Sequence, residues 1–126
     1  MSLRTPLGKV LGLGSAHDGT GHWWMQRVTA VALLLLGLWF VAALLYMDGF
    51  TYLEVIRFIS QPVNAVLLAL LAATLTWHSY LGVQVVIEDY IHTPAAKLIW
   101  LLFSRFAHAF LAIASVYAIV VIGAST

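Results

Sequence analysis

Three long apolar stretches constrain this chain more than any other feature of its sequence. They run over about 28–47, 63–87 and 98–122, and each can cross the hydrocarbon core of a bilayer, which takes about 20 residues of helix. The stretches are apolar on every face, which argues against a water-soluble three-helix bundle. Hydrophobic residues make up 63% of the chain and charged residues 9%. We therefore predict an all-α membrane protein with three transmembrane helices and a single domain over residues 1–126.

The distribution of Lys and Arg predicts how the helices are oriented. The side shared by the N-terminus and the second connection carries Arg4, Lys9, Arg27 and Lys97, whereas the other side carries Arg57. Cytoplasmic loops carry the excess of positive charge. We therefore expect a cytoplasmic N-terminus and a periplasmic C-terminus. The expected location is a bacterial inner (plasma) membrane, with the mitochondrial inner membrane as the less favoured setting.

The segment before the first apolar stretch is rich in glycine. Glycine disfavours regular helix, so we expect residues 1–22 to form a flexible cytoplasmic segment. It lacks the apolar core of a cleavable signal peptide. The adjacent Trp23 and Trp24 are typical of the membrane interface.

Cysteine is absent from the chain. The chain therefore cannot hold an iron–sulfur cluster through thiolates, form a disulfide or attach haem covalently. Any haem that it binds must be non-covalent, of b type, with nitrogen ligands.

His78 lies deep in the second apolar stretch and is a candidate metal ligand. Eleven residues at about 100° per residue return to nearly the same helical face, so His78 shares a stripe with Asp89. The full stripe is Leu71, Leu75, His78, Gly82, Val85 and Asp89. An ionisable ring inside a membrane bundle is costly without a partner. A b-type haem iron takes imidazoles on both faces, and Gly82 would leave room for the flat macrocycle. The alternative is a cross-helix hydrogen bond.

The third stretch carries a second pair of polar residues, Arg105 and His108. His108 is a weaker candidate for the second haem ligand, and we favour a cross-helix hydrogen bond or a partner contact. Arg105 can snorkel to the interface or pair with an anionic group such as a haem propionate. Their roles stay open.

Asp89 and Tyr90 lie where the second stretch meets water. A phenol can donate a hydrogen bond to a quinone carbonyl, and a nearby carboxylate can orient it or handle a proton. The alternative is an interfacial tyrosine beside a helix-end aspartate.

These motifs together resemble a known family. The run Thr-Trp-His-Ser-Tyr-Leu-Gly at 76–82, followed by Glu-Asp-Tyr at 88–90, resembles the His-x-x-x-Gly-x(6)-Asp-Tyr signature of the smaller, D-type hydrophobic membrane anchor subunit of succinate dehydrogenase. Gln-Arg-Val-Thr-Ala at 26–30 is similar to the Arg-x-Thr-Ala element of that subunit. The Gly-Ser-Ala stretch followed by His-Trp-Trp at 22–24 is similar to its alphaproteobacterial and mitochondrial-like branch.

The resemblance implies a function shared with partner chains. An anchor of respiratory complex II docks a flavoprotein subunit and an iron–sulfur subunit to the membrane and has no catalysis of its own. The resemblance implies that His78 gives one axial ligand to haem b and that a second hydrophobic anchor subunit gives the other. It places Arg27 near the haem propionates, and Tyr90 on ubiquinone with Asp89 beside it. No nucleic-acid partner is expected.

Two other readings remain open from the sequence. One is the anchor of a fumarate reductase, or a self-contained b cytochrome that uses His78 with His108. The other is a structural three-helix adaptor that binds no haem. The sequence leaves open the quinone type, the haem potential, the direction of the reaction and the higher oligomeric state.

Overall fold

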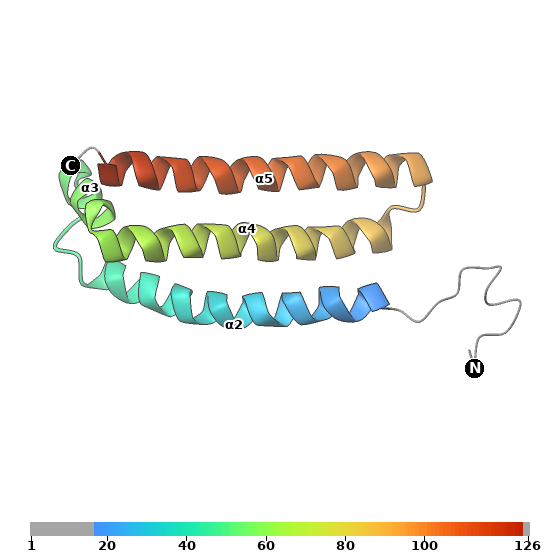
Figure 1. Cartoon of the computed structure of the whole chain (residues 1–126), viewed down its shortest axis with the longest axis horizontal. Coiled ribbons are helices and arrows are strands. Elements are labelled where there is room, and N and C mark those ends of the chain that lie inside the picture. Colours follow the sequence, from blue (N-terminus) through green and yellow to red (C-terminus); the bar gives the residue numbers. More distant parts are fainter. Residues whose placement is uncertain (1–16, 125–126) are drawn as a thin grey trace, which may run out of the picture.

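The computed structural model describes residues 17–124, and all of its regular elements over this range are α-helices. They are α2 (His17–Leu45), α3 (Tyr52–Ser60), α4 (Pro62–Tyr90) and α5 (Pro94–Ala124) (Figure 1). Three segments are long and apolar enough to cross a membrane: Thr20–Leu45, Pro62–Tyr90 and Pro94–Ala124. The predicted all-α class and the three spanning segments are therefore confirmed.

The first helix begins earlier than the sequence led us to expect. Residues 17–22 belong to α2, where we expected a flexible segment, and residues 1–16 lie outside the described range. Gly19 and Gly21 each cost the helix only about 1 kcal/mol relative to alanine. Extending an existing helix adds a hydrogen bond without a new nucleation step. The long apolar helix can therefore continue through this glycine-rich turn.

The second long helix starts and stops at residues that explain its bounds. Pro62 occupies the first turn of α4, where its missing N–H would have no intrahelical partner. At the other end, Asp89 and Tyr90 are the last residues of the helix, and the Ile91 N–H donates to the Ile87 carbonyl at 3.0 Å. The candidate quinone residues therefore sit at a helix end.

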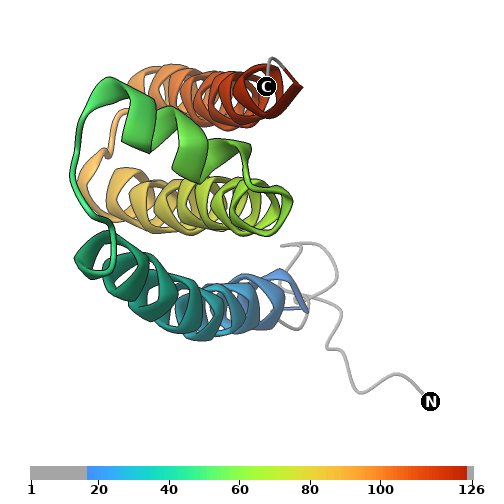
Figure 2. The ribbon, with the colours of Figure 1, turned by 90° about the vertical axis from the view of Figure 1, so that its left-hand side faces the viewer.

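The three long helices form a layer with α4 in the middle (Figures 1 and 2). Helix α4 packs against α2 on one side and α5 on the other, while α2 and α5 do not contact each other within residues 17–124. The short α3 lies against the ends of α4 and α5. Helix α4 thus takes part in two contacts, the α2–α4 seam (Gln26, Thr29, His78, Gly82) and the α4–α5 seam (Ser79, Tyr80, Ser104, His108).

Few side chains are buried in the described part of the chain. They are Thr29, Leu81, Ile87 and Ser104, so half of them are small polar residues. In lipid, helices associate through close packing of small residues and cross-helix hydrogen bonds. Large apolar residues such as Leu35 (65% exposed) and Phe106 (72% exposed) face outward instead. This pattern fits a lipid or subunit environment and agrees with the prediction against a soluble bundle.

The short helix α3 is fixed at its start by a capping box. The Glu54 N–H donates to Thr51 Oγ1 at 3.4 Å, and the Thr51 N–H donates to Glu54 Oε2 at 2.8 Å. The hydrogen bonds that the Thr51 N–H and the Thr51 hydroxyl donate to the Glu54 carboxylate lower the pKa of Glu54. A Cβ at Gly49 would lie 2.6 Å from Glu54 Oε2, so a side chain there would displace the carboxylate.

Candidate functional site

His78 extends from α4 toward α2, and both nitrogens of its ring contact α2 side chains. Thr29 Oγ1 lies 2.8 Å from His78 Nδ1, and Gln26 Nε2 lies 3.4 Å from His78 Nε2. Gln26 and Thr29 are three residues apart, so they share one face of their helix. The imidazole is half-buried between the two helices. Helix α2 therefore holds the imidazole through one short contact, from Thr29, and one longer contact, from Gln26.

The surroundings of Thr29 favour one tautomer of His78. A hydroxyl has a single proton to donate, and two acceptors within α2, the carbonyls of Met25 (2.8 Å) and Gln26 (3.2 Å), compete for it. With the hydroxyl proton directed to these carbonyls, the Thr29 oxygen faces His78 as an acceptor, which favours the tautomer in which His78 Nδ1 carries the proton. This leaves the His78 Nε2 lone pair toward the Gln26 amide nitrogen, 3.4 Å away, in a tautomer that can bind a metal through Nε2.

The same face of α2 carries polar atoms that lack hydrogen-bond partners. Gln26 Oε1 and His22 Nε2 are buried and unpaired within the described part of the chain. Leaving such a group unsatisfied costs about 1–3 kcal/mol. His22, Gln26 and Thr29 follow one another at helical spacing. The α2–α4 seam therefore has hydrogen-bonding capacity that this chain does not use by itself.

Gly82 lies one turn beyond His78 on the same side of α4. A Cβ built there would be 3.7 Å from Gln26 Nε2, an ordinary contact distance. The predicted shared face of His78 and Gly82 is thus present, because both meet Gln26. Within this chain the space beside Gly82 would also admit a methyl group, so the predicted role of Gly82 toward a macrocycle stays a prediction.

Asp89 and Tyr90 project from the end of α4. Both are exposed, Tyr90 by 81%, and neither side chain makes a hydrogen bond or ion pair with residues 20–124. Eleven residues separate Asp89 from His78, or about 16 Å along the helix axis. The two candidate sites are therefore distinct, and the phenol is open to a ligand or partner from outside this chain.

The connection after Tyr90 is held by polar contacts to Glu88. The ammonium group of Lys97 donates to the Glu88 carbonyl at 2.8 Å, and Gln84 Nε2 donates to Glu88 Oε1 at 2.8 Å. The Lys97 bond joins the end of α4 to the start of α5, while the Gln84 bond lies within α4. They fix the backbone that presents Tyr90 without using the Tyr90 hydroxyl.

Arg27 follows Gln26 directly on α2 and packs over the Trp23 ring. Its guanidinium carbon is 5.5 Å from the centre of the Trp23 ring, a cation–π distance, and the side chain is exposed. Trp23 and Trp24 are exposed by 57% and 61%, and their predicted role as interfacial anchors stays a prediction. The predicted contact of Arg27 with haem propionates involves atoms outside this chain and stays a prediction.

The α4–α5 seam is organised around His108. His108 Nδ1 donates to the Ser104 carbonyl at 2.7 Å, so Nε2 is the acceptor and receives the Ser79 hydroxyl at 3.2 Å. The centres of the Tyr80 and His108 rings lie 5.8 Å apart, and the two ring planes meet at 63° in a T-shaped arrangement. The cross-helix hydrogen bond predicted for His108 is therefore confirmed.

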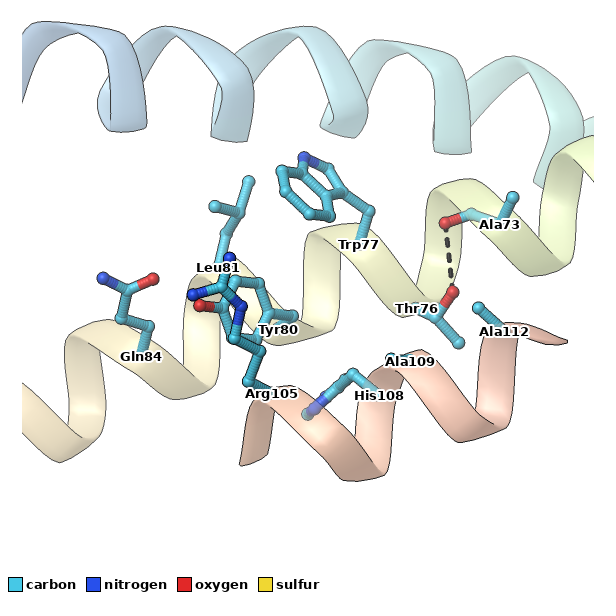
Figure 3. Close-up of a pocket in the computed structure, with 10 residues that line it drawn as sticks. All are labelled: Ala73, Thr76, Trp77, Tyr80, Leu81, Gln84, Arg105, His108, Ala109 and Ala112. Atoms are coloured by element: carbon cyan, nitrogen blue, oxygen red, sulfur yellow. Dashed lines mark hydrogen bonds between the residues drawn. The ribbon is translucent and has the colours of Figure 1, made fainter. Parts of the chain in front are cut away.

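A cavity of about 430 Å³ lies next to this seam, between α4 and α5 (Figure 3). Arg105, His108, Tyr80, Trp77 and Gln84 are among the residues that line it. Arg105 makes no hydrogen bond or ion pair within residues 20–124. His78 does not line the cavity, because it faces α2 instead.

Two residues of the α2–α4 seam, Gln26 and Thr29, were not assigned a role from the sequence. A signal for them was present, since His22, Gln26 and Thr29 recur at helical spacing on a largely apolar helix. That spacing shows that they share a face. It does not show that the face meets His78, which depends on how the helices pack.

Comparison with known proteins places the chain in a family. Residues 1–122 match the family model described as succinate dehydrogenase/fumarate reductase transmembrane subunit. The chain is 38% identical over 88 residues to the succinate dehydrogenase hydrophobic membrane anchor subunit of Rickettsia bellii, which covers 70% of each chain.

Two further relatives extend the similarity. The subunit of the same name from Paracoccus denitrificans is 32% identical over 119 residues, covering 94% of this chain and 92% of the relative. The succinate dehydrogenase membrane anchor subunit of Reclinomonas americana is 30% identical over 95 residues, covering 72% and 78%. With its three spanning helices, this multi-pass membrane protein belongs to the family of succinate dehydrogenase hydrophobic membrane anchor subunits.

Proposed function

We propose that this chain docks the flavoprotein and iron–sulfur subunits of succinate:ubiquinone oxidoreductase to the membrane, co-ligates haem b through His78 and contributes Tyr90 and Asp89 to the ubiquinone site. The observation that carries the proposal is the difference between the contacts of the two ring nitrogens of His78. Its Nδ1 lies 2.8 Å from the Thr29 hydroxyl oxygen, and its Nε2 meets only a 3.4 Å contact from Gln26, beside buried polar atoms that have no partner among the described residues.

The residues of the α2–α4 seam fit a haem ligand. A ligating histidine usually donates its other ring N–H to a fixed acceptor, and Thr29 is such an acceptor. The contact of Gln26 Nε2 with His78 Nε2, at 3.4 Å, exceeds the usual 2.7–3.2 Å of an N–H hydrogen bond. Because this contact is weak, a haem iron that binds His78 Nε2 could displace the Gln26 amide at little cost. When bound, haem b would supply a one-electron redox centre.

The second axial ligand comes from the partner anchor subunit in this proposal. His108 belongs to the other seam, where Ser104 and Ser79 occupy both of its ring nitrogens. These observations favour one ligand from this chain and speak against a haem held by His78 and His108 together.

Tyr90 and Asp89 supply the quinone chemistry expected of this chain. The exposed Tyr90 hydroxyl would donate a hydrogen bond to a quinone carbonyl, while Asp89 orients the phenol or passes a proton during reduction. The support is their position at the end of α4, with side chains that no other described residue engages. The remaining contacts to the quinone would come from partner subunits.

We also propose a bacterial inner membrane as the location, with the N-terminus cytoplasmic and the C-terminus periplasmic. The start of α2 and the α4–α5 connection lie at one end of the molecule, and α3 lies at the other (Figure 1). Arg27 and Lys97 therefore share an end opposite to Arg57, which supports the positive-inside orientation. The exposed apolar faces of the helices would contact lipid and the second anchor subunit.

The proposal is tested by purifying the complex in detergent through a tag on this chain. We expect a b-type reduced-minus-oxidised optical spectrum, with a flavoprotein and an iron–sulfur protein identified in the same preparation by mass spectrometry. A preparation with both partners but no haem would remove the haem assignment and leave the docking role. A colourless chain without these partners would refute the proposed function.

A further inference from the structure

We propose that Thr29 is a positioning residue for His78: its hydroxyl oxygen accepts the Nδ1–H bond that sets the tautomer and rotation of the imidazole. This inference rests on the proposed haem ligation by His78. The bond is 2.8 Å long and joins α2 to α4 across 49 residues of sequence. Thr29 would thus act on haem binding without touching the iron.

The acceptor is held rigidly in place. Thr29 is one of the few buried side chains, with 8% of its surface exposed. Its hydroxyl proton is directed to the Met25 and Gln26 carbonyls of its own helix, and its branched side chain has restricted rotamers. Because the Thr29 hydroxyl cannot move when the imidazole rotates, the hydrogen bond is kept only in one orientation of the ring.

The bond also changes the chemistry of the opposite nitrogen. An acceptor at Nδ1–H raises the basicity of a ligating histidine, and loss of such a partner typically lowers metal affinity about 10- to 100-fold. A more basic ligand stabilises ferric over ferrous iron. Removing the Thr29 hydroxyl should therefore weaken haem retention and shift the midpoint potential upward.

The chain offers a matched control in Thr76 on α4. Like Thr29, Thr76 donates its hydroxyl to carbonyls of its own helix, those of Ala72 at 2.7 Å and Ala73 at 3.0 Å. Its hydroxyl makes no hydrogen bond to a histidine ring among the described residues. A Thr→Val change at either position removes a hydroxyl and keeps the side-chain shape, but only Thr29→Val removes a partner of His78.

The experiment compares Thr29→Val, Thr29→Ser, Thr76→Val and His78→Ala in the full purified complex. Haem retention is measured as the rate of haem transfer to apomyoglobin, and the electronic state by potentiometric titration and low-temperature electron paramagnetic resonance. We expect Thr29→Val to release haem about tenfold faster or more, with a raised potential and an altered low-spin signal. Thr29→Ser and Thr76→Val should match the parent complex.

The outcomes separate this inference from the proposed function. Wild-type haem release, potential and signal in Thr29→Val, together with haem loss in His78→Ala, would overturn the role of Thr29 and leave ligation intact. Unchanged haem in His78→Ala would refute ligation itself. A shift in Thr29→Ser as large as that in Thr29→Val would also overturn the inference. If Thr29→Val does not assemble, Thr29→Ala replaces it, with the same expected result.

Discussion

The two seams of α4 each contain a histidine, yet they leave it in different states. In the α4–α5 seam, both ring nitrogens of His108 have good partners in Ser104 and Ser79. In the α2–α4 seam, His78 has one short bond to Thr29 and one long contact to Gln26. His108 is hydrogen-bonded to Ser79 across its seam through Nε2 at 3.2 Å, whereas Nε2 of His78 has only the 3.4 Å contact with Gln26.

This difference shows that a membrane-buried histidine is not a functional site by residue type alone. Buried polar groups in lipid need partners, and a cross-helix bond satisfies that need as well as a metal does. The distinguishing observation is the length of the contact at Nε2, which is 3.2 Å for His108 and 3.4 Å for His78. By that measure His78 is the candidate ligand, and His108 is a structural link.

The largest expected effect comes from removing each histidine in turn. His78→Ala should lose most of the haem, whereas His108→Ala should keep the haem content of the parent complex. The measurement is the haem-to-flavin ratio of the purified complex, by the pyridine haemochromogen assay. Loss of haem in His108→Ala, with haem retained in His78→Ala, would mean that His108 is the ligand and His78 the structural link.

The next prediction tests whether Tyr90, at the end of α4, acts in quinone reduction independently of the two helix seams. Tyr90→Phe removes only the hydroxyl, and losing one hydrogen bond of about 1.4 kcal/mol in the transition state would lower quinone reduction about tenfold. Succinate oxidation with a soluble artificial acceptor, and the haem content, should be unchanged. Equal loss in both assays would instead indicate a role of Tyr90 in assembly.

A smaller effect is expected from the bond that closes the α4–α5 seam. A double-mutant cycle of Ser79→Ala and His108→Ala should give a coupling of about 0.6 kcal/mol, the average for such bonds in a membrane protein. Unfolding of the chain in detergent micelles measures it. Ser60→Ala with His108→Ala is the control, because the Ser60 hydroxyl bonds only the Ile56 carbonyl of its own helix, so these changes should be additive. A Ser79–His108 coupling of zero would contradict the assigned role of His108.

The smallest effect lies outside both seams, in the capping box of α3. Because Thr51 lowers the pKa of Glu54, the carboxylate's contribution to stability is present above its unfolded-state pKa and is lost as pH falls through the lower folded-state pKa. Amide hydrogen exchange in the first turn of α3 should accelerate over that acidic range. Glu54→Gln should abolish this pH dependence; its persistence would assign the effect to another group.

Some features could be predicted from the sequence because they depend on local pattern. The length of the apolar stretches predicted the three spans, and helical periodicity placed His78 and Gly82 on one face. The bounds were less predictable: α2 begins at His17, inside a glycine-rich segment. There, the gain from extending a helix outweighs the weak local preference against it.

The sequence by itself determined the all-helical membrane class, the family signature and the residue types that could bind haem or quinone. Only the tertiary structure decided that α4 lies between α2 and α5, that Thr29 meets His78, and that Ser79 meets His108. The physical reason is that periodicity fixes which residues share a helix face but not which faces meet. In a membrane that choice depends on close packing of small residues and on hydrogen bonds between particular positions of different helices.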